Sequence, residues 1–322
     1  MTNQFKSLFS ERLYEFVQQK NAIGFPYEES TRLLIDFDHF CIYKFPDKPI
    51  LSKEICLAWA VRKDTEGNNT FRNRLMPVRE FARYLNRCGE EAYVLSQNFA
   101  KKGARHIPHI YSEEEITALW HTLDNLQSRK GYPVRHLVIP IMVRLLYYCG
   151  LRPCEARKLR TNDVDLEKSR LYIMESKGHK SRIVMMANDV TVLCRKYDET
   201  VSLIMPEREV FFPNSQGGVY GKGGLDKTFR IARKKACVGL ADEHLPRLYD
   251  FRHTFATHRL YQWMWEGKDV SAMLPYLSAY MGHAQLSDTY YYIHLIPGMF
   301  EKMAGFDYSA MEFLLPEVEC DE

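Results

Sequence analysis

Four short segments, far apart in a chain of 322 residues, carry the side chains best suited to chemistry on a phosphate. A guanidinium group is planar, permanently charged and able to bind two phosphoryl oxygens at once. A tyrosine hydroxyl can act as a nucleophile and form a covalent intermediate. The segments are GLRPCE with Arg152, SKGHK with Lys177, YDFRHTFATH with Arg252, and MGHAQLSDTYYYIH with His283 and Tyr292. Each pattern alone arises often by chance, so the argument depends on their order and spacing.

In that order and spacing, the segments resemble the catalytic signature of the tyrosine site-specific recombinases, the phage integrase family. That signature is an arginine in a G-L-R-x-x-E box, a hairpin lysine, an H-x-x-R-H box, a G-H box, and a tyrosine nine residues beyond the G-H histidine. The matching positions here are Arg152 with Glu155, Lys177, Arg252 with His253, Gly282 with His283, and Tyr292. The resemblance extends from about residue 70 to residue 295.

The resemblance implies a recombinase that cuts and rejoins DNA strands through a 3′-phosphotyrosine and a free 5′-hydroxyl. Tyr292 would attack the phosphorus, and Arg152 and Arg252 would stabilise the charge that grows on the phosphoryl oxygens. A lysine on the hairpin, Lys177 or secondarily Lys180, would protonate the leaving 5′-oxygen. The implied reaction needs neither a metal ion nor a nucleotide cofactor.

One position departs from the family pattern: Tyr249 stands where the first histidine of H-x-x-R-H is usual. A tyrosine hydroxyl can hydrogen-bond a phosphate, but with an ordinary pKa of about 10 it is a poorer base than imidazole near neutrality. His283 or His253 could take over as the base, or the attack could proceed with little base assistance. The sequence leaves these alternatives open.

Three consecutive tyrosines, at positions 290 to 292, raise a separate question. On a helix, successive side chains point about 100° apart, so one of the three at most can face the phosphate. The spacing from His283 selects Tyr292.

The elements that position these residues are mainly helical. The apolar run VRHLVIPIMVRLLYYCG predicts a buried helix that ends at Gly150, and Pro153 is typical of the first turn of the next helix. Arg152 is therefore expected at a helix start. The β-prone runs RLYIME and RIVMM flank the glycine-containing SKGHKS and predict a hairpin that carries Lys177 at its turn.

The first 95 residues are also expected to be helical, because apolar residues recur at steps of three and four. In FRNRLMPVREFARYLNR, Arg72, Arg79 and Arg83 fall on one face, where they could follow a phosphate backbone. Pro77 predicts a kink or a new helix start there. Lys101 and Lys102 lie in a linker with little apolar periodicity and are further candidates for DNA contact.

Ser112 and Glu115 have the spacing of a capping box and predict the first helix of the second domain. We therefore expect a helical core-binding domain over residues 1–105 that clamps DNA, and an α+β catalytic domain over residues 106–295. The tail, residues 296–322, has an apolar stripe of Met311, Leu314 and Leu315 among acidic residues. The resemblance implies that the tail would dock on a neighbouring protomer of a tetramer on DNA; packing on its own domain is the alternative.

Composition favours the same class without proving it. The net charge is +3, yet residues 295–322 hold one lysine and seven acidic residues, so the rest of the chain is more basic. The eight cysteines form no CxxC pair, which argues against a disulfide framework or a zinc site. No signal peptide or membrane span is evident, and we expect a bacterial-type cytoplasmic, nucleoid-associated protein without a membrane partner.

The predicted function is integration, excision or transposition of a mobile element. Two rivals remain: a DNA-binding protein of the same fold that has lost catalysis, and a relaxing enzyme of the type IB topoisomerase kind.

Overall fold

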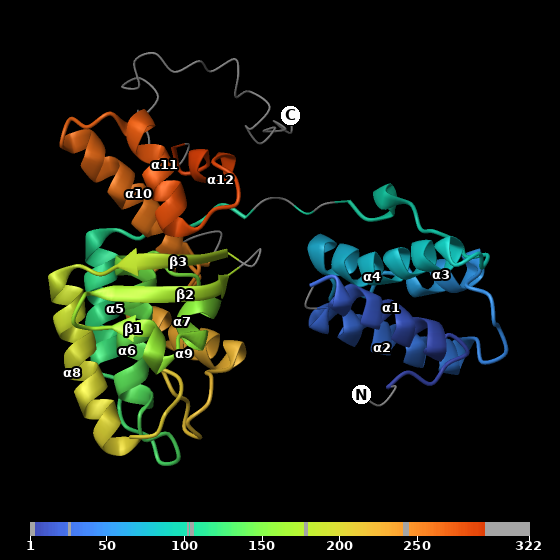
Figure 1. Ribbon diagram of the computed structural model, residues 1–322, viewed down its shortest axis with the longest axis horizontal. Coiled ribbons are helices and arrows are strands. Elements are labelled where there is room, and N and C mark those ends of the chain that lie inside the picture. The colour runs from blue at the N-terminus through green and yellow to red at the C-terminus, as the bar shows by residue number, and fades with distance from the viewer. Residues whose placement is uncertain are drawn as a thin grey trace. The chain divides into compact units, whose positions relative to one another are not determined.

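The computed structural model describes residues 4–24, 27–101, 103, 106–176, 180–240 and 245–293 (Figure 1). Within residues 175–180 it describes no side chain. The chain divides into an N-terminal unit that ends at His106 and a C-terminal unit that begins at Ile107. Each unit has a hydrophobic core of its own.

The N-terminal unit is helical in its described residues. Phe71, Leu75, Val78 and Leu85 form the buried stripe of its longest helix, which continues through Pro77 as one element, so no new helix begins at the proline. Asp38 is fully buried on a second helix, and its carboxylate accepts hydrogen bonds from the backbone N–H groups of residues 6 and 7, which holds the segment before the first helix in place. The elements are α1 (Ser10–Ala22), α2 (Glu28–Lys44), α3 (Lys53–Trp59), α4 (Asn68–Arg87) and the 3-10 turn Gln97–Phe99.

The C-terminal unit combines helices with a small antiparallel sheet of strand order β1-β2-β3, which confirms the predicted fold class. The predicted hairpin is present, with Leu171 opposite Val184. The strands are β1 (Val164–Asp165), β2 (Arg170–Ser176) and β3 (Lys180–Met185). The helices are α5 (Glu113–Asp124), α6 (Arg135–Tyr148), α7 (Pro153–Lys158), α8 (Asn188–Ile204), α9 (Lys222–Lys235), α10 (Asp250–Trp265), α11 (Val270–Met281) and α12 (Ser287–Tyr290), with a 3-10 turn at Thr161–Asp163.

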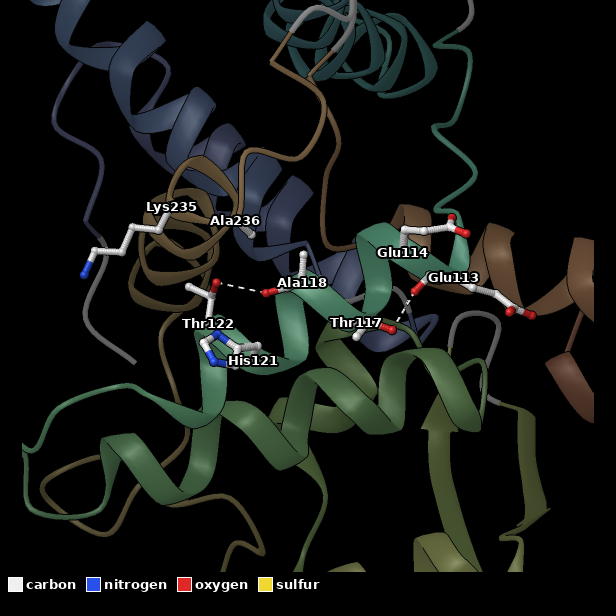
Figure 2. A pocket seen from close by; sticks show the side chains of 8 residues that line it. All are labelled: Glu113, Glu114, Thr117, Ala118, His121, Thr122, Lys235 and Ala236. Carbon is white, nitrogen blue, oxygen red and sulfur yellow. Dashed lines mark hydrogen bonds between the residues drawn. The ribbon is translucent and has the colours of Figure 1, made fainter.

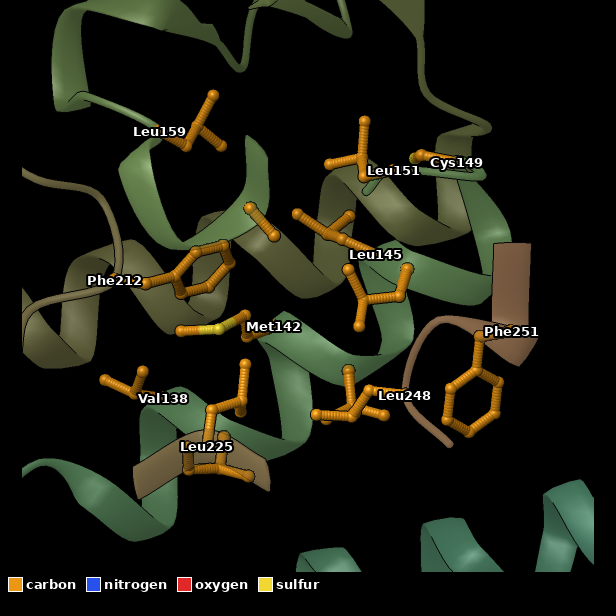
Figure 3. Close-up of a cluster of buried hydrophobic side chains, with 14 of the residues drawn as sticks. Val138, Met142, Leu145, Cys149, Leu151, Leu159, Phe212, Leu225, Leu248 and Phe251 are labelled. Atoms are coloured by element: carbon orange, nitrogen blue, oxygen red, sulfur yellow. The ribbon is translucent and has the colours of Figure 1, made fainter. Parts of the chain in front are cut away.

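Helix α6 lies in the main core of this unit. It is apolar almost all round, as expected of a helix covered on several sides, and it contacts α5, α7, α8 and α10. Figure 3 shows Val138, Met142 and Leu145 of this helix within the cluster. Cys149 and Leu151, both buried in the same cluster, flank Gly150 and so anchor the loop that leads to Arg152.

A second cluster joins the last helices of the unit. It contains Phe255 and Leu260 of α10 and Leu274 and Met281 of α11, and it extends to Tyr292. Figure 1 shows α10 and α11 side by side with the short α12, and α11 also contacts β3. The sheet, α10, α11 and the segment with Tyr292 are therefore held in one packed body.

Helix α5 begins with the predicted capping box, in which Ser112 Oγ accepts the Glu115 N–H and the Glu115 carboxylate accepts the Ser112 N–H. None of the helices in the described residues is both long and apolar enough to cross a membrane. In the same part of the chain, no three histidine, cysteine or acidic side chains gather closely enough to hold a metal ion.

Candidate active site

Arg152 precedes the first turn of α7, as predicted, with Pro153 as the first helical residue. Glu155, one turn later, accepts the Arg152 backbone N–H at 2.8 Å and its Nη1 at 2.7 Å. Arg152 Nη2 donates to the Gly282 carbonyl at 3.0 Å, 130 positions along the chain. The guanidinium is thus fixed between a carboxylate and the end of α11.

Arg252, in the first turn of α10, is 1% exposed. Its Nη1 donates to the Gly150 carbonyl at 2.6 Å and its Nη2 to the Met281 carbonyl. Its Nε is buried and has no hydrogen-bond partner among the described residues. Burial, and then the Arg152 charge, lower the pKa of Arg252, but arginine still keeps its proton. A buried cationic donor of this kind is able to bind an anion.

Tyr292 lies against this arginine pair and is 3% exposed. Burial raises the pKa of Tyr292 to about 12, while the charges of Arg252 and Arg152 act in the opposite direction. The ring lies between two histidines, with centroid distances of 5.4 Å to His253 and 5.8 Å to His283. The phenol is therefore protonated near neutrality and lies where the arginines would favour its ionised form.

The other two tyrosines of the triplet are less buried. Tyr290 and Tyr291 are both half-buried, and the Tyr291 ring lies 6.1 Å from His253 and 6.0 Å from Tyr292. Of the three, Tyr292 is the one fully enclosed beside Arg252 and Arg152.

Tyr249, the position that departs from the family pattern, is 39% exposed and directly precedes α10. Its ring lies 5.2 Å from that of His253. Burial lowers the pKa of Arg152, but contacts with Glu155 and then with Tyr249 outweigh burial and raise this pKa. The structure thus places Tyr249 beside Arg152, where its hydroxyl would be close to a bound phosphate.

His283 follows Gly282, which ends α11 in the left-handed conformation at φ +66°. Its Nδ1 shares a hydrogen bond of 2.7 Å with the Thr289 hydroxyl. Burial, followed by the charges of Arg252, Arg152 and Arg182, lowers the pKa of His283 to about 3. The ring is therefore neutral at pH 7 in the DNA-free protein and is no proton donor there.

This depressed pKa predicts a specific dependence of stability on pH. His283 protonates near 6.5 when unfolded and near 3 when folded, so the stability that its neutral ring contributes is present above pH 6.5. That contribution is lost as the pH falls from 6.5 towards 3, by at most about 1.4 kcal/mol per pH unit. Urea unfolding of His283→Gln should show a shallower decline over this window than wild type. His121→Gln, at an exposed position of α5, should follow wild type; an unchanged slope in His283→Gln would contradict the prediction.

Lys177 lies outside the described residues. Lys180, the second candidate for the proton donor, begins β3, but its side chain is not described. Lys102 is likewise outside the described residues, whereas Lys101 is exposed.

The N-terminal arginines do not form one free face. Arg72 is exposed, and Arg83 is partly exposed and pairs with Glu80 at 2.7 Å. Arg79 is 6% exposed and donates to the carbonyls of Leu95 and Ser96 at 2.9 and 2.8 Å. Arg79 therefore does not belong to an exposed basic face, because the segment after α4 covers its side chain and accepts hydrogen bonds from its Nε and Nη2.

Two features were missed by the sequence analysis. The first is Arg182 on β3, which binds Glu155. The sequence signal for it was its position two residues before the buried Val184, because alternate residues of a strand face the same side and a charged residue on the inward side needs a partner. Helix α9 presents Lys227, Arg230 and Lys234 on its exposed side, at the three- and four-residue spacing of one helix face.

An open groove between α5 and α9 is a separate feature (Figure 2). Its walls include Glu113, Glu114 and Lys235, and the Thr117 and Thr122 hydroxyls donate to carbonyls of their own helix. Two carboxylates oppose phosphate binding, so the groove does not compete with the arginine site.

Comparison with known proteins agrees with this geometry. The phage integrase family profile matches residues 110–298. A Sinorhizobium fredii protein described as an integrase/recombinase is 32% identical over 295 residues, or 89% of this chain and 93% of that protein.

Two solved structures share the fold. The XerH site-specific recombinase in a post-cleavage complex with its palindromic difH substrate has a TM-score of 0.62 at 18% identity, covering 97% of this chain and 86% of that one. A lambda integrase dimer bound to a core site has a TM-score of 0.59 at 13% identity, covering 97% and 99%. The chain belongs to the phage integrase family, the tyrosine site-specific recombinases.

Proposed function

We propose that this protein cuts and rejoins double-stranded DNA at specific sites through a covalent 3′-phosphotyrosine at Tyr292. The observation that supports it most is the buried Arg252 Nε, a cationic donor without a partner among the described residues, next to a buried tyrosine. A phosphodiester oxygen is an anionic ligand that this donor could bind. Arg152 and Arg252 would each bind the phosphate, and both are held in place by other contacts before DNA arrives.

In the proposed cleavage step, the Tyr292 oxygen forms a bond to phosphorus as the bond from phosphorus to the 5′-oxygen breaks. During attack the phenol proton passes to a neighbouring imidazole, His253 or His283, or to water, and the 5′-oxygen gains a proton from the candidate lysine, Lys177. The phosphodiester energy is kept in the tyrosine ester, and attack by a 5′-hydroxyl reverses the step. No metal ion or nucleotide is needed for this sequence of bond changes.

Tyr249 would donate a hydrogen bond to the phosphate instead of acting as a base. Its exposed hydroxyl is beside Arg152, where a bound phosphate would accept it. The neutral His283 and the nearby His253 remain the imidazoles closest to the Tyr292 ring.

DNA contact outside the reacting phosphate would come from Arg72 and Arg83 of α4, from Lys101 and Lys102, and from the basic face of α9. Residues 1–105 and 106–295 would act as a core-binding and a catalytic domain that clamp the duplex. By analogy with relatives described as integrases, the substrate would be the ends of a mobile element, and the protein would act in the bacterial cytoplasm at the nucleoid.

A nicked duplex that loses a short strand after cleavage tests the function, because it prevents religation. A trapped protein–DNA adduct supports the proposal. Tight DNA binding without any adduct would favour a non-catalytic DNA-binding protein. Relaxation of supercoils without strand exchange between two sites would favour a topoisomerase-like enzyme.

We further propose that four protomers assemble on two DNA sites and that the tail, residues 296–322, docks on a neighbouring protomer. The tail lies outside the described residues, so the proposal rests on its apolar stripe at Met311, Leu314 and Leu315. Deleting residues 300–322 should reduce two-site synapsis in a gel-shift assay while single-site binding remains. Unchanged synapsis and recombination would show that the tail has no such role.

A further inference from the structure

The end of helix α11 holds three arginines from three different elements. Its last two residues and its C-cap each direct a backbone carbonyl towards one of them. The pairs are Arg182 Nε with Tyr280 at 2.8 Å, Arg252 Nη2 with Met281, and Arg152 Nη2 with Gly282 at 3.0 Å. Two of these arginines belong to the proposed phosphate site, and the third has no role in it so far.

A helix C-terminus suits this arrangement for two physical reasons. Its last carbonyls have no partner within the helix, and the helix dipole makes that end negative. Gly282 turns the chain at φ +66°, and a Cβ there would lie 2.9 Å from Arg182 Cδ. The close packing of Arg182 on Gly282 thus requires glycine at this position.

Arg182 also grips the carboxylate that orients Arg152. Its Nη1 and Nη2 donate to the two oxygens of Glu155 at 2.9 and 2.8 Å, while Arg152 Nη1 donates to one of the same oxygens at 2.7 Å. The Glu155 side chain is 4% exposed and that of Arg182 is 9% exposed, so water screens the pair little. All three nitrogens of Arg182 have protein partners, which leaves it poorly placed to bind DNA itself.

The charges around Glu155 explain how the Arg182–Glu155 ion pair affects Arg152. With Arg182 removed, Arg152 would be the cation left on a buried carboxylate. A fork-to-fork pair with both Glu155 oxygens would then be the favoured geometry for Arg152, with its donors turned away from the phosphate. Because Arg182 binds both oxygens of Glu155, Arg152 shares only one of these oxygens and donates its other terminal nitrogen to the Gly282 carbonyl.

We propose that Arg182 is a positioning residue for DNA cleavage: by clamping Glu155 to the end of α11, it sets the direction of the Arg152 guanidinium. Because Arg182 lies on β3, it also links Arg152 to the β2–β3 pair of strands. The inference rests on the proposed function and adds a residue to its site.

The test compares Arg182→Gln, Arg182→Lys and wild type on the nicked trapping duplex at saturating DNA. We expect Arg182→Gln to form the adduct about 100-fold more slowly, the cost of a misplaced catalytic group, with DNA affinity within threefold of wild type. Arg182→Lys should recover part of the rate, because it restores the charge on Glu155 without the fork. Arg195→Gln is the matched control, since Arg195 is exposed on α8 and donates to the Leu166 carbonyl, and it should cleave at the wild-type rate.

A double-mutant cycle tests whether Arg182 acts through Glu155. If it does, Arg182→Gln/Glu155→Gln should be no slower than the slower of the two single variants. The proposal would be overturned if the rate losses of the two single variants multiplied in the double variant. It would also be overturned if Arg182→Gln cleaved at the wild-type rate, or if it lost only DNA affinity. If Arg182→Gln melts below the assay temperature, Arg182→Lys decides by the same rate and affinity criteria. Absence of an adduct with wild type would instead count against the proposed function.

Discussion

Tyr292→Phe should form no covalent DNA adduct while it binds DNA and folds like wild type. The change removes the one oxygen that would bond to phosphorus and keeps the ring that packs with His253 and His283. Because Tyr292 belongs to the cluster with Phe255 and Met281, a phenylalanine fills the same space, and we expect its melting temperature within a few degrees of wild type. Adduct formation should fall below detection, by at least about 10⁴-fold.

The tyrosine triplet supplies the controls for this experiment. Tyr290→Phe and Tyr291→Phe remove the same atom from half-buried neighbours and should still form the adduct. Peptide mapping of the wild-type adduct should place the DNA on residue 292. An adduct in Tyr292→Phe at the wild-type rate would move the nucleophile to one of the neighbours and break the link with the arginine pair.

The sequence predicted local structure where local chemistry determines it. Pro153 as the first helical residue after Arg152, the Ser112 capping box and the β2–β3 hairpin are set by residues within a few positions of one another, and all are present. The mainly helical fold with a small sheet follows from periodicity in the same way.

What the sequence could not predict depends on contacts between distant segments. Arg79 has the helical position of a surface arginine, but the carbonyls of Leu95 and Ser96, 16 and 17 positions later, cover it. Arg182 has no motif that pairs it with Glu155, 27 positions earlier. The low pKa of His283 comes from burial and from arginines on three other segments. Helix periodicity assigns a side chain to a face, and tertiary packing decides whether that face is open.

Arg252→Lys should be the most damaging change among those that conserve charge. Arg252 uses two nitrogens to hold the Gly150 and Met281 carbonyls and keeps Nε for the phosphate. A lysine ammonium is a compact point charge and cannot span both carbonyls and the phosphate from this buried position. We expect adduct formation about 10³-fold slower at saturating DNA, in line with removal of a preorganised transition-state donor. DNA affinity should change far less, because one phosphate contact among many is altered.

Arg259→Lys, two turns further along α10 where Arg259 bonds Gln262, is the matched control and should cleave normally. A DNA with a methylphosphonate at the scissile position separates the phosphate role from a packing role, because it removes one negative oxygen. If Arg252 neutralises that oxygen, the difference in cleavage rate between wild type and Arg252→Lys should be smaller on this DNA. If Arg252 only joins Gly150 to α11, the difference in cleavage rate should be the same on both DNAs, and the assignment of Arg252 to the phosphate would fail.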